Sequence, residues 1–225
     1  MKQRIDIRSL NVSGKKGVIK TPVPEARFTL EGMEGDAHAG PWHRQVSLLA
    51  AESIRKYEDN TGTKVPDGGF GENITTEGFL LHHARPLDRF VSGNLVLELT
   101  QVGKKCHGGR CAIYKSTGEC IMPDEGIFCR VLQEGKLQPG DRLEYVPRTF
   151  TLKVITLSDR ASSGFYSDRS GPIIVEEMDR WFGQKKLKHS STSVVLPDDR
   201  ETFSRELEST ISDKTDLVFT TGSTG

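Results

Sequence analysis

Residues 220–225 form a glycine- and hydroxyl-rich turn that directly follows a short apolar run. The turn is Thr-Thr-Gly-Ser-Thr-Gly, and residues 217–219 before it are Leu-Val-Phe. A parallel strand delivers its carboxyl end to an anion site through such a turn, because glycine lets the backbone approach a ligand closely and hydroxyls add donors. A turn of this kind normally opens a helix. We therefore expect residues near 220 to belong to the first half of a nucleotide- or phosphate-handling domain.

The residues before this turn alternate between strand and helix patterns. We expect three strands and two amphipathic helices, in the order strand 152–157, helix 172–182, strand 191–196, helix 199–211 and strand 216–220. This order predicts a parallel, doubly wound sheet with its ligand at the carboxyl ends of the strands. Polar segments follow all three strands, so the sequence predicts one shared site at that edge.

The residues up to 148 are richer in turns and short extended runs. The strongest strand pattern is 95–102, where apolar residues alternate, and helices are expected over 46–57 and over 124–135. Many short strands with few helices indicate a β-barrel-like domain. We therefore expect a mixed α/β chain, with a barrel-like domain over 1–148 and a partial α/β domain over 149–225.

Composition gives no support for several classes of function. The chain of 225 residues has 31 acidic and 31 basic side chains and no net charge, which gives no support for nucleic-acid binding or for a polybasic membrane anchor. No run approaches the roughly 20 apolar residues that span a bilayer, and the amino-terminal residues lack an apolar signal core. We expect a cytoplasmic protein whose four cysteines are reduced thiols.

Three segments of the first domain carry candidate site residues. A glycine-containing loop over 34–40 includes His38 and is followed by Arg44, and a second glycine-rich loop over 68–73 ends at Asn73. Cys106 is flanked by Lys104, Lys105 and His107. Positive neighbours lower the pKa of a thiol and favour the thiolate, which is the form that binds metals or accepts sulfur.

These segments resemble the MOSC domain, a family named for its place at the carboxyl terminus of molybdenum-cofactor sulfurases. The resemblance rests on four segments in the family's order, namely GDAHAG, FGENITTEG, the Cys106 segment and PGDRL. It implies that Cys106 is the catalytic residue and is linked to cofactor sulfur or to molybdenum itself. It also implies that the pterin phosphate or the oxo groups are held by His38, Arg44, Asn73 and Lys104. Glu72 is expected either to orient its neighbours or, as a surface carboxylate, to have no role.

The second domain resembles the molybdopterin adenylyltransferases, a MogA/MoaB-like family. The resemblance rests on SDRASSGFYSDRSGP from Ser158, LPDD from Leu196 and TTGSTG from Thr220. It implies an active-site role for Asp198. It also implies that the pterin pocket is lined by Ser158, Asp159, Arg160, Gly222 and Thr224. In an intact domain of this family, carboxylates would hold Mg²⁺ against the phosphates of ATP.

Two departures from that family bear on activity. Ser223 replaces the glycine that the family usually has in its turn. The family also continues past the turn with a second catalytic aspartate and further strands and helices. We therefore expect a truncated or vestigial domain without adenylyltransferase activity.

The sequence predicts a molybdenum-cofactor binding protein that handles cofactor sulfur or metal through Cys106, in cofactor biosynthesis or maturation. A sulfur transferase and a molybdenum-dependent enzyme both fit this description. Assembly as a homo-oligomer is also compatible with it. One alternative is a non-catalytic carrier or insertion chaperone that serves other molybdenum-cofactor enzymes. A second is a structural zinc protein using Cys106, His107, Cys111 and Cys120, although their spacing lacks paired C-x₂-C ligands.

Overall fold

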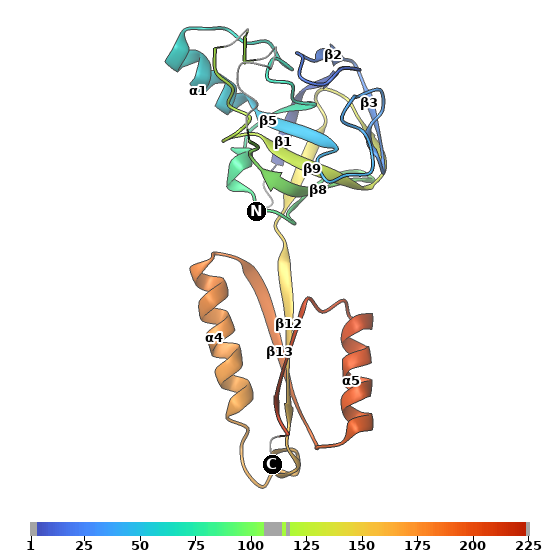
Figure 1. Ribbon diagram of the computed structural model, residues 1–225, viewed down its shortest axis with the longest axis vertical. Helices are drawn as coiled ribbons and strands as arrows, with labels where there is room; N and C mark the ends of the chain where they lie inside the picture. Colours follow the sequence, from blue (N-terminus) through green and yellow to red (C-terminus); the bar gives the residue numbers. More distant parts are fainter. Residues whose placement is uncertain (1–3, 106–113, 116–117, 224–225) are drawn as a thin grey trace. The chain divides into compact units, whose positions relative to one another are not determined.

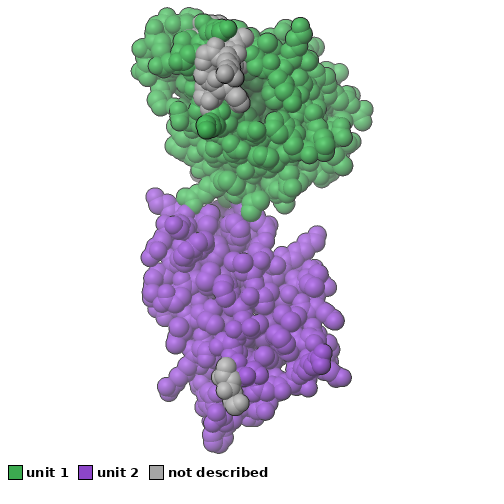
Figure 2. All heavy atoms as spheres, viewed as in Figure 1, with its two compact units in different colours: residues 1–147 green, residues 148–225 purple. Residues whose placement is uncertain are grey.

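The computed structural model describes residues 4–105, 114–115 and 118–223. The chain divides into two compact units, Met1–Pro147 (unit 1) and Arg148–Gly225 (unit 2), which Figure 2 shows in different colours. No helix among the described residues is long and apolar enough to cross a membrane.

Unit 1 is built on a closed β-barrel (Figure 1). Among the described residues, seven strands pair in the order β11-β7-β8-β9-β5-β6-β1, and β1 pairs back onto β11. These strands are β1 (Arg4–Val12), β5 (Val46–Ala50), β6 (Ile74–Glu77), β7 (Arg89–Ser92), β8 (Leu95–Val102), β9 (Ile127–Gln133) and β11 (Arg142–Val146). Closure pairs both edges of the sheet, so the predicted barrel-like domain is confirmed.

Shorter strands and two helical segments lie outside the closed ring of strands. β2 (Thr21–Val23) extends β1, and a small separate sheet consists of β3 (Ala26–Thr29), β4 (Gly32–Met33) and β10 (Gly135–Leu137). The helix α1 (Ala51–Thr61) follows β5 directly, and η1 (Leu81–His83) is a single 3₁₀ turn. Loops between these elements contain most of the candidate site residues of unit 1.

Two apolar clusters form the core of unit 1. Alternate residues of β8 point into the barrel, and Leu95, Leu97 and Leu99 are completely buried, which confirms the strand predicted at 95–102. A second cluster lies under α1, where Ile54 and Tyr57 pack with buried neighbours that include Phe70. The two clusters together hold the barrel wall and its helix in place.

Two helix predictions were wrong in whole or in part. The segment expected as a helix over 124–135 is mainly the strand β9, in which Ile127, Cys129 and Val131 face the core. Pairing with β8 on one side and β5 on the other fixes this segment as a strand. The helix expected over 46–57 begins only at Ala51, because the residues before it form β5 in the barrel wall.

Unit 2 is a three-stranded parallel sheet with helices on both faces. Its elements are β12 (Thr149–Leu157), α3 (Asp159–Ser162), α4 (Ser170–Gln184), β13 (Lys188–Leu196), α5 (Arg200–Ser212) and β14 (Leu217–Gly222). The strand order is β13-β12-β14, and both pairings are parallel. Figure 1 shows α4 and α5 on opposite sides of the sheet, so the predicted doubly wound arrangement is confirmed.

Gly222 provides a stability test for unit 2. Its φ of +96° is in the region that favours glycine, and an added Cβ would collide with the Leu157 carbonyl oxygen. We expect Gly222→Ala to destabilise unit 2 by roughly 1–3 kcal/mol. Gly183→Ala in α4 is the matched control, because its added methyl meets no atom within 4 Å. Urea unfolding of the full chain checks this, and equal midpoints for the two variants would contradict it.

Candidate functional site

Positively charged side chains gather around two aromatic rings of unit 1. The guanidinium carbon of Arg44 lies 4.9 Å from the centroid of the Trp42 ring and 5.9 Å from that of Phe128. Lys16 Nζ lies 5.3 Å from the Trp42 centroid, and Lys104 Nζ lies 5.5 Å from the Phe128 centroid. We call Lys16, Arg44 and Lys104, with these two rings, the cationic cluster. Three loops and the strand β9 contribute to it, so the barrel brings together residues far apart in the sequence.

The charges of the cationic cluster are not neutralised within the described residues. No carboxylate among them forms an ion pair with Lys16, Arg44 or Lys104, whereas many other basic side chains of unit 1 have such partners. The Arg44 Nε atom is buried and has no hydrogen-bond acceptor in the described part of the chain. A buried N–H without an acceptor is uncommon, and a planar guanidinium suits the oxygens of phosphate. The cluster therefore has the donors and the charge to bind an anion.

A buried ion pair lies close to this cluster. Lys20 Nζ donates to Asp36 Oδ2 over 2.7 Å, and the two side chains are 1% and 0% exposed. Ser13 N donates to the same oxygen, while the backbone N and Nδ1 of His38 contact Oδ1 at 2.9 and 3.1 Å. Burial raises the pKa of Asp36, but the hydrogen bonds from His38 and the charge of Lys20 outweigh it and hold that pKa well below its usual range. Burial lowers the pKa of Lys20.

The loop that carries His38 and Arg44 is fixed by its own hydrogen bonds. Trp42 Nε1 donates to the His38 carbonyl over 2.6 Å, and the rings of these two residues stack at 6.4 Å between centroids. Thr100 Oγ1 in β8 donates to the His43 carbonyl over 2.5 Å. His38 and Arg44, both predicted from sequence, are therefore held near the same indole ring.

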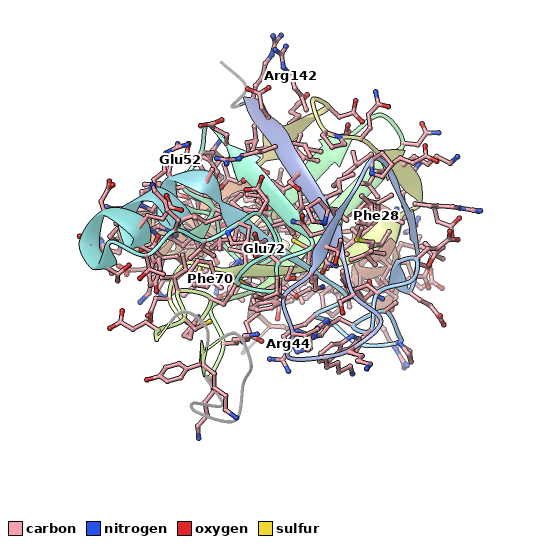
Figure 3. All side chains as sticks on the ribbon, turned by 90° about the horizontal axis from the view of Figure 1, so that it is seen from above. Phe28, Arg44, Glu52, Phe70, Glu72 and Arg142 are labelled. Carbon is pink, nitrogen blue, oxygen red and sulfur yellow. The ribbon has the colours of Figure 1, made fainter. Side chains whose placement is uncertain are left out.

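The second glycine-rich loop is ordered from the inside by Glu72, which orients its neighbours from a buried position. Glu72 is completely buried, not exposed at the surface, and Figure 3 shows it in the interior of unit 1. Its carboxylate accepts from Gly68 N at 2.7 Å, from Phe70 N at 3.1 Å and from Thr75 Oγ1 at 2.9 Å. Burial raises the pKa of Glu72. Glu72 thus fixes the shape of the loop from inside.

Asn73 is also completely buried. Its Oδ1 accepts from the backbone N and the hydroxyl of Ser47, and its Nδ2 contacts the Asn11 carbonyl and Met33 Sδ at 3.3 Å each. These contacts occupy the hydrogen-bonding groups of its amide. The structure thus uses the Asn73 side chain to connect β1, β4 and β5 inside unit 1, and gives no support to the expectation that it holds the cofactor.

Cys106 lies outside the described residues, and so do His107 and Cys111 of the zinc alternative. The described residues beside this segment are anchored: Gly103 N donates to the Gly126 carbonyl over 2.7 Å, and Lys104 N donates to the Pro123 carbonyl over 3.2 Å. Within the part of the chain that the structure describes, no group of three His, Cys, Asp or Glu side chains could hold a metal.

The other two cysteines are described. Cys129 is completely buried in β9, and burial raises the pKa of its thiol, so it is an unreactive core residue. Cys120 is half-buried beside the cluster under α1.

In unit 2 the three strands end at the same level. Leu157 pairs with Leu196 on one side and with Gly222 on the other. Ser158 caps α3 by accepting from Ala161 N, and Asp159 Oδ1 accepts from Asp198 N over 2.9 Å, which connects the ends of β12 and β13. The structure therefore brings together the polar segments that the sequence placed at this edge.

The remaining predicted residues of unit 2 differ in their surroundings. The Arg160 guanidinium lies 5.5 Å from the centroid of the Tyr166 ring. The carboxylate of Asp198 makes no hydrogen bond or ion pair with the described residues, whereas Asp199 caps α5 through Thr202 N. The hydrogen bond from Thr202 lowers the pKa of Asp199. Thr224 lies outside the described residues.

Sequence reasoning missed several residues that shape these sites. In unit 2, Asp168 accepts from Thr156 Oγ1, Ser170 N and Gly171 N, and so orders the loop before α4. In unit 1, the pairing of Lys20 with Asp36 joins residues 16 positions apart, and no local pattern signals it. Asp36 is part of the quoted GDAHAG segment, and its place two residues before His38 was the available signal.

Two family models match the chain. The MOSC domain model matches residues 35–144, and a model described as a probable molybdopterin binding domain matches residues 153–225. Among known proteins, the uncharacterized protein YflK of Bacillus subtilis is 28% identical over 158 residues, which cover 63% of this chain and 69% of YflK. The molybdopterin adenylyltransferase of Pyrococcus furiosus is 38% identical over 79 residues, 35% of this chain. This chain spans 43% of that relative.

Solved structures share the fold. The YUAD protein from Bacillus subtilis matches with a TM-score of 0.53 at 18% identity, over 66% of this chain and 100% of the other. YiiM from Geobacillus stearothermophilus matches with a TM-score of 0.52 at 24% identity, over 64% of this chain and 76% of the other. At these identities the matches show a common fold and nothing about shared activity.

The hydrogen bonds of Glu72 give a stability test for unit 1. We expect Glu72→Ala to cost roughly 2–3 kcal/mol, because the buried N–H groups of Gly68 and Phe70 would lose their acceptor. Asp67→Ala is the control, since Asp67 makes a partly exposed ion pair with Arg8 that contributes about 1 kcal/mol or less. Chemical denaturation of both variants measures the difference. A loss for Glu72→Ala no greater than for Asp67→Ala would refute the structural role.

Proposed function

We propose that the chain binds the molybdenum cofactor and handles its sulfur or metal through Cys106, because residues 35–144 match the model of the MOSC domain and residues 153–225 match the model of a probable molybdopterin binding domain. The two domains indicate a molybdenum-cofactor-related function, since each is associated with the same cofactor. The further assignment to Cys106 rests on the chemistry of the residues around it.

The observation that carries the proposal is the cationic cluster. Among the described residues, its charges have no carboxylate partner and the buried donor Arg44 Nε has no acceptor. The pterin cofactor carries a phosphate, and a phosphate dianion matches this set of donors. Lys104 belongs to the cluster and precedes Cys106 by two positions in the sequence. One residue that fits the cofactor's anionic group is therefore close in the chain to the candidate sulfur ligand.

Each side chain has a distinct task in this proposal. Arg44, Lys16 and Lys104 hold the phosphate, and the positive charges of Lys104 and Lys105 favour the thiolate form of Cys106. When bound, the cofactor supplies the molybdenum centre and its exchangeable sulfur. The Cys106 thiolate is the group of this chain that would bind the metal or carry the sulfur.

Unit 2 is proposed to hold the pterin at the carboxyl ends of its strands. Ser158, Asp159, Arg160 and Gly222 are grouped there, and Thr224 follows directly in the sequence. Asp198 has a carboxylate without a partner among the described residues, so it is our candidate for holding Mg²⁺ beside phosphate oxygens. We do not propose adenylyl transfer for this unit.

Metal and pterin analysis of protein expressed with molybdate tests the proposal. We expect wild type to contain molybdenum and pterin, and Arg44→Ala to bind both about tenfold more weakly, because a charge-assisted contact is lost. Cys106→Ala should keep pterin and lose most of the molybdenum or its exchangeable sulfur. Arg27→Ala is the control, because Arg27 is an exposed arginine of β3 paired with Glu34.

The outcomes separate the parts of the proposal. Equal molybdenum and sulfur in wild type and Cys106→Ala would remove Cys106 from the site. Equal pterin in Arg44→Ala and Arg27→Ala would remove the cationic cluster. Sulfur-transfer assays on loaded protein distinguish an enzyme from the carrier alternative, which would bind the cofactor without turnover.

A further inference from the structure

The loop between β12 and α4 carries two exposed aromatic rings that the proposed function does not use. Phe165 and Tyr166 are 80% and 44% exposed, and they follow the short helix α3. The loop leaves the carboxyl end of β12, which lies beside the carboxyl ends of β13 and β14. A single exposed ring is common on protein surfaces, so its surroundings decide whether it has a role.

Hydrogen bonds on both sides of the two rings hold the loop in place. Before them, Phe165 N donates to the Arg160 carbonyl over 2.9 Å. After them, the Asp168 carboxylate accepts from Thr156 Oγ1 at 2.8 Å and from Ser170 N at 3.0 Å, which connects the loop to β12 and to the start of α4. The rings therefore extend from an ordered segment of backbone.

Tyr166 contacts two residues of the proposed pterin site. Its hydroxyl forms a hydrogen bond of 3.1 Å with Ser158 Oγ, and the guanidinium carbon of Arg160 lies 5.5 Å from the centroid of its ring. Ser158 Oγ also accepts from Ala161 N, so the tyrosine hydroxyl is bound to the cap of α3. These contacts fix the orientation of the ring before a ligand binds, while 44% of the residue stays exposed.

Phe165 lacks this support. Within the part of the chain that the structure describes, its ring makes no stacking or cation–π contact, and the residue is 80% exposed. Ordering a side chain during binding costs entropy, whereas a ring that is already fixed avoids that cost. Of the two neighbouring rings, Tyr166 is therefore the one that is organised to bind a flat ligand.

Resting on the proposed function, we propose that the planar pterin ring of the cofactor stacks on Tyr166, which Ser158 and Arg160 hold in position. Flat nitrogen heterocycles stack on aromatic side chains and on guanidinium planes, and this loop offers both groups next to the strand ends. Adenine shares this chemistry. We assign the pterin because residues 153–225 match the model of a probable molybdopterin binding domain.

Binding of 6-carboxypterin to the full chain, followed through the quenching of pterin fluorescence, tests this inference. Tyr166→Leu should weaken binding about tenfold, because the stacked ring is lost. Tyr166→Phe keeps the ring and loses only a partly exposed hydrogen bond, so its affinity should stay within about threefold of wild type. Phe165→Leu is the matched control, since it removes the neighbouring ring of the same loop, and its affinity should equal that of wild type.

Several results would overturn the inference. These are no binding of 6-carboxypterin by wild type, equal affinity in wild type and Tyr166→Leu, or a loss in Phe165→Leu as large as that in Tyr166→Leu. Urea unfolding of each variant shows whether a loss reflects misfolding, and an affinity restored in Tyr166→Phe shows that the ring itself is required.

Adenosine monophosphate is the second ligand to be measured. Binding of this nucleotide that depends on Tyr166, with no binding of 6-carboxypterin, would assign the ring to a nucleotide and overturn the pterin assignment. The proposed function is judged separately. If protein expressed with molybdate contained no cofactor but still bound 6-carboxypterin through Tyr166, the proposed function alone would be refuted.

Discussion

The buried ion pair between Lys20 and Asp36 is the interaction on which the site of unit 1 depends. Removing two charges from water is costly, and the pair is tolerated only because every oxygen of Asp36 has a donor. The pair connects the segment that follows β1 to the loop that carries His38. If either partner were lost, an uncompensated charge would remain inside the protein.

The barrel makes this arrangement possible because it closes. Pairing of β1 with β11 removes both edges of the main sheet and fixes the positions from which its loops leave. Trp42 and Phe128, which are far apart in the sequence, lie close together in space, and Arg44 is within cation–π distance of both rings. The paired strands thus fix the positions of the loops that carry the site residues.

Much of the fold could be predicted because it follows from local patterns. The alternation of apolar residues in 95–102 predicts a strand, and the order of strands and helices in unit 2 predicts a parallel sheet. The connection rules for parallel sheets then place the three strand ends at one edge. The segment after Asp124 was ambiguous. Ile127, Phe128 and Val131 fit a helical spacing, while Ile127, Cys129 and Val131 fit a strand, and only pairing with β8 and β5 decides between them.

The site could be predicted less completely. His38, Arg44 and Lys104 were named from the sequence because they lie in or beside the segments that resemble the MOSC domain. The sequence does not show that a polar residue is buried. Glu72 and Asn73 were therefore expected to face solvent or a ligand, whereas both are completely buried and form hydrogen bonds in the protein interior. The partner of Asp36 could not be foreseen, since it depends on how two loops meet in space.

The central claim is that the molybdenum cofactor binds beside the cationic cluster with its metal or sulfur at Cys106. Alkylation of the cysteines by iodoacetamide, quantified by peptide mass spectrometry with and without bound cofactor, tests it most directly. The account predicts that the cofactor slows modification of Cys106 strongly and leaves the half-buried Cys120 unchanged. Equal rates at Cys106 in the loaded and the cofactor-free protein would contradict it.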